Sequence, residues 1–201
     1  MNKQTNKVKD WRQTWLKFKE GDMDAFNRIY VAYFDKLHAY GSKLTNDNSI
    51  LEDSIQELFL QLYTRRSKLA NDVNLEYYLL KSLKLTIYQR LRRKGRMVFS
   101  GLARDDSESG SFIFKLENEE ELSEDESNKQ LRKVLGELDQ KQRELLYLKF
   151  YNSLSYKEIG EILGINPDSA KKQVYRIIKK IKQNLNGFSL ELFLYVVQHR
   201  K

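Results

Sequence analysis

Cysteine is absent from this chain of 201 residues, and proline occurs only once. Without cysteine the protein can form neither a disulfide framework nor a thiolate metal site, which fits a reducing compartment. Glycine is sparse as well, with nine residues. Most apolar residues recur three and four positions apart, and this spacing predicts a protein that is almost entirely helical.

A long apolar run is also missing. No stretch approaches the ~20 apolar residues that a membrane-spanning helix needs, and residues 1–10 lack the apolar core of a signal peptide. We therefore expect a soluble, cytoplasmic protein. Its formal net charge of +8 favours a polyanionic partner, for which DNA, RNA and an anionic membrane are the candidates.

Charge is distributed unevenly along the chain. Residues 105–128 contain ten acidic residues and one basic residue, although the chain as a whole is basic. A self-repelling segment with few large apolar side chains predicts a flexible linker. The expected fold is all-α, with two small helical domains joined by this acidic linker. The predicted divisions are an N-terminal tail (1–14), a first domain (15–98), the linker (99–128), a second domain (129–187) and an apolar C-terminal tail (188–201).

Local cap signals predict where several helices begin. Asp22 precedes one apolar pattern, and Ser49 with Glu52 has the form of a capping box, in which each side chain bonds the other residue's backbone amide. Asp139 predicts a similar start in the second domain. Three helices are expected between about residues 15 and 65.

Residues 155–183 have the pattern of a helix-turn-helix motif with a basic second helix. Ser155 and the glutamate three residues later form a capping box, and Gly164 can adopt the left-handed backbone that ends the first helix. Asn166 can cap the second helix, with Pro167 in the first helical position, where its missing N–H costs nothing. Two helices joined by so short a turn are typical of a motif that enters the DNA major groove.

The second helix of this motif has an apolar stripe on one face and cations on the others. The stripe must pack in any such motif, so functional residues are expected at the outward positions. The first turn of a recognition helix meets base edges, and later positions meet phosphates. A packed helical hairpin with a solvated basic face is the alternative. The expected DNA contacts are Asp168, Ser169, Lys171, Lys172, Tyr175 and Arg176.

A second basic region is the predicted helix near residues 75–96. It holds seven cations and no carboxylate between residues 81 and 96, with tyrosines interleaved. Cations neutralise phosphates, and aromatic faces stack on unpaired bases. The alternative is a solvated helical face with the tyrosines packed inward. The expected nucleic-acid contacts of this helix are Tyr77, Tyr78, Lys81, Lys84, Tyr88, Arg90, Arg92 and Arg93.

Asp53 and Glu57 share one helical face, which suggests acid–base catalysis or metal binding as one interpretation. However, the chain has only two histidines, His38 and His199, in unrelated contexts, and it has no Gly-rich phosphate loop. A solvated face or a protein-contact face is therefore favoured. We expect no catalytic residue, no metal or cofactor, and no small-molecule substrate.

The order of these motifs resembles the sigma-70 family of RNA polymerase sigma factors, specifically the extracytoplasmic-function (ECF) group. Residues 21–26 are similar to the opening of family region two, and residues 53–59 to its second helix. Residues 154–160 and 166–171 are similar to the two helices of the region-four motif. Leu138-Asp139 departs from the family, which has a Leu-Pro pair there. The domain that separates these regions in larger sigma factors is absent, as in the small ECF type.

The resemblance implies that the protein binds core RNA polymerase and promoter DNA and is not itself an enzyme. In the family, the segment that corresponds to residues 53–57 binds the polymerase, and the next helix melts the promoter. The loop before that next helix catches an unstacked base, here near Asn71 and Asn74. Region four binds an upstream promoter element as duplex. Many relatives carry Asn and Asp where this chain has Leu85 and Gln89, so individual base contacts do not carry over. The residues implied in polymerase binding are Asp53, Ser54, Ile55, Gln56 and Glu57.

Two other functions are compatible with parts of the sequence. A stand-alone helix-turn-helix regulator of transcription would explain the second domain without the first. An RNA-binding adaptor would explain the basic helix of the first domain but not the helix-turn-helix. The tail at 188–201 predicts a last helix packed on the second domain, with a docking surface for an anti-sigma factor as the alternative. We expect the sigma factor, because it accounts for both domains.

Overall fold

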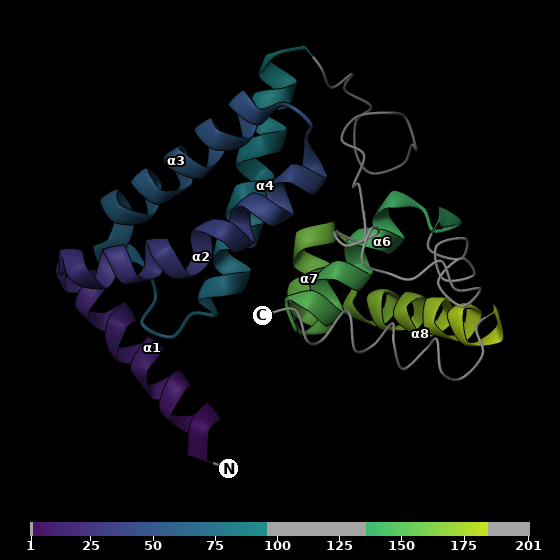
Figure 1. Ribbon diagram of the computed structural model, residues 1–201, viewed down its shortest axis with the longest axis horizontal. Helices are drawn as coiled ribbons and strands as arrows, with labels where there is room; N and C mark the ends of the chain where they lie inside the picture. The colour runs from purple at the N-terminus through teal and green to yellow at the C-terminus, as the bar shows by residue number, and fades with distance from the viewer. Residues whose placement is uncertain (1, 96–135, 185–201) are drawn as a thin grey trace, which may run out of the picture. The chain divides into compact units, whose positions relative to one another are not determined.

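The computed structural model of the protein describes residues 2–95 and 136–184. The chain divides into two compact units, with the boundary between Gly101 and Leu102. All regular secondary structure in the described ranges is helical, which confirms the all-α prediction (Figure 1). The predicted linker (99–128) and apolar tail (188–201) lie outside these ranges. In the part of the chain that is described, no helix is long and apolar enough to cross a membrane.

The first unit begins with a helix that is longer than predicted. Residues 2–14, assigned above to a tail, are part of α1. The ring of Trp11 lies edge-on to Tyr33, with 5.7 Å between centroids, and Thr14 is buried, so α1 already packs before Trp15. The bounds of the elements are α1 (Asn2–Glu20), α2 (Met23–Leu44), α3 (Asn48–Arg65), a 3-10 turn η1 (Arg66–Lys68) and α4 (Leu75–Arg93).

The phenol of Tyr33 lies in this contact between α1 and α2. Burial disfavours its charged form, and the carboxylate of Glu76 adds to the effect, so the pKa of Tyr33 is raised to about 12. Lys36 forms an ion pair with Glu76 at 2.9 Å and lies 5.5 Å from the centroid of the Tyr33 ring. Tyr33 is therefore neutral throughout the physiological pH range.

Helix starts in the first unit follow the predicted caps with one exception. Asp22 caps α2, accepting a hydrogen bond from the Ala25 amide at 3.0 Å, as predicted. The prediction that Ser49 opens α3 is wrong: Asp47 is the cap and accepts from the Ile50 amide at 3.1 Å. The amide of Asp47 in turn donates to Thr45 Oγ1 at 3.1 Å. This bond holds the aspartate at the helix entrance, so α3 starts before Ser49.

All four helices of the first unit contribute to its core, in which α2, α3 and α4 pack against one another (Figure 1). Gly41 of α2 lies against both other helices, since a Cβ atom there would be 2.3 Å from Leu51 Cδ1 of α3 and 3.3 Å from Ile87 Cδ1 of α4. A glycine side chain of one hydrogen lets the helices approach this closely. Among the largest fully buried side chains are Phe18, Ile29, Leu37, Tyr40, Leu44, Ile50, Leu51, Ile55, Leu62 and Leu79.

The second unit is a smaller helical cluster. Asp139 caps α6 as predicted, in a capping box in which the Gln142 amide donates to Asp139 Oδ1 at 2.8 Å and Gln142 Oε1 accepts from the Asp139 amide at 3.1 Å. A π-helical turn follows, which the sequence pattern did not predict. The elements are α6 (Gln140–Leu146), the π turn η2 (Tyr147–Tyr151), α7 (Tyr156–Leu163) and α8 (Pro167–Asn184).

Candidate nucleic-acid and protein-contact surfaces

The ends of α7 and the start of α8 are fixed by contacts that are local in sequence. The Ser155 amide donates to Glu158 Oε2 at 2.8 Å and the Glu158 amide donates to Ser155 Oγ at 3.3 Å. Gly164 has a φ of +67°, the left-handed conformation that ends α7. Asn166 then caps α8 by accepting from the Asp168 amide at 2.8 Å. The predicted helix-turn-helix is confirmed.

A second glycine, not singled out by the sequence, closes this motif. A Cβ atom at Gly160 would be 2.6 Å from the carbonyl oxygen of Ile165 and 3.4 Å from the nitrogen of Pro167. The Ile165 amide also donates to the Gly160 carbonyl at 2.9 Å. The chain entering α8 therefore lies directly against the backbone of α7, and this contact sets the angle between the two helices.

The outward side of α8 is a basic surface, which we call the recognition face. Its six predicted contact residues are all exposed, and Tyr175 has 71% of its surface accessible. Within residues 136–184 no ion pair is formed by Lys171, Lys172 or Arg176, whereas Lys180 pairs with Glu137 at 2.9 Å. Ala170, Val174, Ile177 and Ile181 form the buried stripe of the helix.

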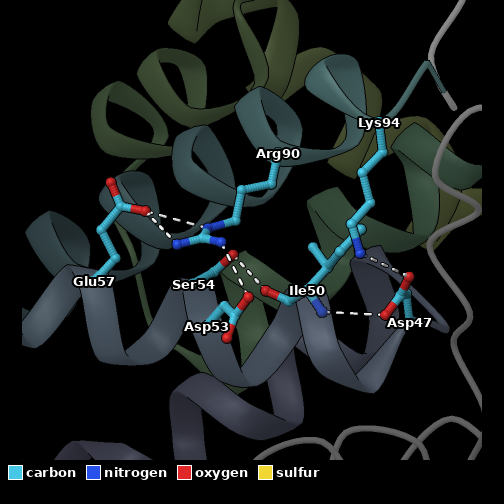
Figure 2. A network of polar contacts seen from close by, with 7 residues as sticks. All are labelled: Asp47, Ile50, Asp53, Ser54, Glu57, Arg90 and Lys94. Carbon is cyan, nitrogen blue, oxygen red and sulfur yellow. Dashed lines mark hydrogen bonds and ion pairs between the residues drawn. The ribbon is translucent and has the colours of Figure 1, made fainter.

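Helix α4 differs, because two of its cations are bonded to α3. Arg90 donates from Nη2 and Nε to Glu57 Oε2 at 2.7 and 3.2 Å, and from Nη1 to Asp53 Oδ2 at 3.1 Å. One turn further along, Lys94 lies 3.7 Å from Asp47. Figure 2 shows the guanidinium of Arg90 between the two carboxylates. The packing of α4 on α3 thus directs Arg90 away from the outer surface on which it was predicted.

Two lysines of α4 lie against tyrosines of the same helix. Lys84 is only 9% exposed, and its Nζ lies 5.4 Å from the centroid of the Tyr88 ring. Lys81 donates to the hydroxyl of Tyr77 at 2.7 Å. Lys84 was predicted at the nucleic-acid surface, but the packing of α4 against its neighbours buries it. Outward positions of α4 are Leu85, which is 54% exposed, and Gln89, Arg92 and Arg93, which are also exposed.

The loop before α4 is anchored at both of its predicted base-contact residues. Asn74 caps α4, accepting from the Tyr77 amide at 3.3 Å, and Asn71 accepts a hydrogen bond from Lys19 of α1. In the part of the loop next to η1, the carbonyl oxygen of Ala70 accepts a hydrogen bond from the indole of Trp15 in α1 at 3.0 Å. Both asparagine side chains are exposed, and the loop is held in place by α1.

The predicted polymerase-binding segment of α3 has an inner and an outer side. Ser54 is fully buried and donates to the carbonyl oxygen of Ile50 at 2.6 Å, and Ile55 is 2% exposed. Asp53 and Gln56 are exposed, and Glu57 is half-buried. Because helical periodicity turns positions 54 and 55 into the core, a partner protein can touch this segment chiefly through its other three residues.

A groove between α2 and α3 was missed by the sequence analysis. It has a volume of about 380 Å³ and borders the exposed side of Gln56. Tyr30 and Phe34 have ring centroids 5.3 Å apart, and Phe34 and His38 have centroids 6.2 Å apart, so three rings follow one another along α2. The signal available in the sequence was the spacing of four between these rings. The lining residues are Tyr30, Phe34, Asp35, His38, Glu52, Ile55 and Gln56.

Two family models match the chain. The one described as Sigma-70 region 2 matches residues 29–97, and the one described as Sigma-70, region 4 matches residues 128–181. Together they cover more than half of the 201 residues. The first match contains the α3 segment, the loop and α4, and the second contains α7 and most of α8.

Similar proteins are found over most of the chain. The RNA polymerase sigma factor SigZ of Bacillus subtilis (strain 168) is 29% identical over 161 residues, which are 79% of this chain and 86% of that protein. The ECF RNA polymerase sigma factor SigW of the same strain is 27% identical over 174 residues, 83% of this chain and 92% of that protein.

Among solved structures, the sigma factor RpoE from Bartonella quintana, in complex with the anti-sigma factor NepR, has a TM-score of 0.51 and 20% identity. The match covers 79% of this chain and 94% of that chain. At this level of identity the similarity shows that the two proteins share a fold.

Proposed function

Because the chain belongs to the sigma-70 family, as a sigma factor of the ECF group, we propose that three of its surfaces contact polymerase, melted promoter strand and promoter duplex. The protein binds core RNA polymerase and directs promoter recognition, promoter melting and transcription initiation. Region two corresponds in this proposal to residues 15–98 together with the start of α1, and region four to residues 129–187. Catalysis belongs to the polymerase, and the site of action is the cytoplasm.

The polymerase contact is assigned to the outer side of α3 and the groove beside it. Asp53 and Gln56 are exposed on this side, and the groove offers the rings of Tyr30 and Phe34 next to Gln56. Large rings beside a few polar groups are typical of protein–protein contacts. Leu60, one turn beyond Gln56, is 64% exposed and extends the apolar surface.

The duplex contact is assigned to the recognition face of α8. Asp168 and Ser169 lie in its first turn, where a recognition helix meets base edges, and Lys171, Lys172 and Arg176 lie where phosphates are contacted. Their cations form no ion pair within residues 136–184, so no bond within that range has to break before they meet DNA. Tyr175 offers an exposed ring at the same surface.

The melted strand is assigned to the outward positions of α4 and to the loop before it. Arg92 and Arg93 supply exposed cations there, and Leu85 supplies an exposed apolar side chain between them and the loop. Apolar side chains that insert between bases are a known means of unstacking a duplex. Asn71 and Asn74 present amide groups from a loop that α1 holds in place.

A further proposed partner is an anti-sigma factor. RpoE of Bartonella quintana was solved in complex with an anti-sigma factor, and an inhibitor of this kind would act by covering the polymerase contact. The alternative of a stand-alone regulator is not favoured, because a regulator that never joins the polymerase needs no region two, and region two matches over residues 29–97. That match carries the proposal.

The test begins with purified full-length protein and bacterial core RNA polymerase. We expect the two to co-migrate in size-exclusion chromatography and to support run-off transcription from particular promoters in genomic fragments. Gln56→Arg should weaken this association, because it places a positive charge in the proposed polymerase contact. The substitution leaves in place the ion pairs of Arg90 with Asp53 and Glu57. Gln13→Arg is the matched control, since Gln13 is an exposed residue of α1 with the same side chain.

Two results would contradict the proposal. Absence of co-migration, together with persistent binding of duplex DNA, would assign the protein to the stand-alone regulators. Equal association of the Gln56→Arg and Gln13→Arg variants with core would remove the polymerase contact from α3 while leaving the family assignment in place.

A further inference from the structure

We propose that Lys19 of α1 determines which bases the loop before α4 prefers: it holds the amide oxygen of Asn71, so that the amide NH2 group faces the DNA strand and selects thymine or guanine over cytosine or adenine. This role rests on the proposed function, in which the loop contacts the melted strand, and it adds the chemistry by which a base is chosen. The region-two match begins at residue 29, so α1, and Lys19 with it, lies outside the matched family region.

The chemistry of the two side chains fixes the orientation of the amide. Lys19 Nζ donates a hydrogen bond to Oδ1 of Asn71. An ammonium group can only donate, and an asparagine amide has one oxygen that accepts and one nitrogen that donates. The oxygen of Asn71 must therefore lie toward α1, and its NH2 group lies on the other branch of the amide. Within residues 2–95 the Asn71 side chain makes no second hydrogen bond, so this NH2 group is open to a ligand.

The backbone next to Asn71 is also held by α1, so the side chain is presented from a defined place. The carbonyl oxygen of Ala70 accepts a hydrogen bond from the indole of Trp15 at 3.0 Å, and Trp15 is only 5% exposed. Asn71 itself is exposed, and Lys19 is half-buried. Two residues of α1 thus hold neighbouring positions of the loop, one through its backbone and the other through its side chain.

The second asparagine of the loop has its oxygen occupied as well. Asn74 Oδ1 accepts a hydrogen bond from the Tyr77 amide at 3.3 Å, the bond that caps α4. Both amide oxygens that the loop could offer to a base are therefore already bonded to donors of the protein. The ammonium group of Lys19 adds positive charge beside Asn71. The loop consequently presents hydrogen-bond donors rather than acceptors to a DNA strand.

A surface of donors discriminates between bases at one exocyclic position. Thymine and guanine carry a carbonyl oxygen there, O4 and O6, which accepts a hydrogen bond, whereas cytosine and adenine carry an amino group, which donates. An amino group would meet the NH2 group of Asn71 donor against donor, and both would stay unpaired. This position lies at the corner between the Watson–Crick and major-groove edges, so an unstacked base can present it from either edge. The loop therefore favours thymine and guanine.

The experiment measures the dissociation constants of the full-length protein, without polymerase, for two labelled strands of equal length, oligodeoxyuridine and oligodeoxycytidine. Their bases are alike in shape, and uracil has the carbonyl oxygen O4 where cytosine has an amino group. The ratio of the two constants cancels the contacts to phosphate and sugar, which both strands share. We expect the preference for uracil to be about 3-fold greater in the wild type than in Lys19→Met, since a single hydrogen bond in contact with solvent sets it.

Lys19→Met removes the donor while the side chain keeps a similar length, so that the Asn71 amide can turn over. Lys19→Arg keeps a donor and should keep the preference for uracil. The matched control is Lys17→Met, because Lys17 is an exposed lysine in the last turn of the same helix and its loss changes the net charge equally. This control should leave the ratio of the two constants as in the wild type. Thermal unfolding of every variant shows that the comparison is made on folded protein.

The possible outcomes separate base selection by Lys19 from the proposed function. If Lys19 only holds the loop in place, Lys19→Met weakens binding of both strands by the same factor, and the unchanged ratio overturns base selection. An equal change of the ratio in Lys17→Met would also overturn it, because charge alone would then be the cause. Asn71→Ala tests the DNA contact of the loop itself. If this variant binds both strands as tightly as the wild type, the proposed contact fails, and base selection by Lys19 fails with it.

Discussion

The two basic helices of this protein, α4 and α8, have similar charge in the sequence but offer different charge to a partner. In α4 the cation of Arg90 is bonded to Asp53 and Glu57, and Lys94 lies beside Asp47. In α8 the cations of the recognition face point outward. A count of lysines and arginines therefore overestimates the nucleic-acid surface of α4, whereas Lys171, Lys172 and Arg176 of the recognition face of α8 are all exposed.

The difference follows from how much of each helix is buried. Helix α4 packs against both α2 and α3, so much of its circumference is internal, and even Lys84 is buried. Helix α8 also packs against two helices, α6 and α7, but its buried residues form only a narrow stripe, Ala170, Val174, Ile177 and Ile181. A cation at the edge of a wide contact meets the side chains of the next helix, whereas a cation opposite a narrow stripe meets only water.

The largest expected effect is on α8. Arg176→Glu should weaken binding of promoter duplex by about 1–3 kcal/mol, because a phosphate or base contact is lost and a repulsive charge replaces it. Footprinting of the upstream promoter element measures this. Arg93→Glu, the same charge reversal on α4, is the control and should leave that footprint intact. An unchanged footprint with Arg176→Glu would remove the recognition face from the proposal.

A second prediction concerns the glycine that joins α7 to α8. Gly160→Ala should lower the free energy of unfolding of the second unit by about 1–2 kcal/mol, because overpacking against a backbone oxygen outweighs the better helix propensity of alanine. Gly136→Ala is the control, since a Cβ there meets no atom within 4 Å. Urea denaturation followed by circular dichroism compares the two; equal stability would show that the α7–α8 contact adjusts freely.

Stability also distinguishes the cations of the two helices. Arg90→Gln should destabilise the first unit by about 1 kcal/mol, since it leaves two carboxylates facing each other. Arg176→Gln should change stability by less than about 0.5 kcal/mol, as is usual for an exposed residue without such bonds. Denaturation curves of both variants measure this difference. Identical curves would mean that the α3–α4 ion pairs contribute nothing to folding.

The smallest expected effect is a loss of stability at high pH that is linked to Tyr33, and it is absent at neutral pH. The pKa of Tyr33 is raised to about 12 in the folded protein, above the ordinary value of about 10. The folded state therefore holds this proton more tightly, and the associated stability is complete below pH ~10 and is lost as the pH rises toward ~12. Tyr33→Phe should lose less stability than wild type over this range. Parallel pH curves for the two proteins would contradict the assignment.

Most helix starts were predicted correctly, because a cap residue bonds a backbone amide only two or three residues along the chain. Asp22, Asp139, Ser155 and Asn166 each form the expected bond. The error at Ser49 arose because two cap residues lie close together, and the bond between Thr45 and the Asp47 amide favours the earlier one. The π turn was not predicted, because its pattern of apolar residues continues that of an ordinary helix.

The residues of the candidate surfaces were predicted less accurately than the positions of the helices. The six residues of the recognition face are all exposed as expected. On α3 and α4, three of the predicted contact residues are buried: Ser54, Ile55 and Lys84. The sequence could not exclude them, because the angle at which each helix packs decides which of its residues face outward. The groove beside Gln56 depends on α2 and α3 lying side by side, and neither helix contains it alone.

By itself the sequence determined the helical class, the positions of most caps and the helix-turn-helix, because these depend on side chains that bond backbone atoms within one turn. The tertiary structure decided which charges are available to partners. The carboxylates that hold Arg90 lie 33 and 37 residues away in the chain, on a helix that α4 meets only in the folded core. No local pattern encodes such a pairing, since it exists only once the core has packed α3 against α4.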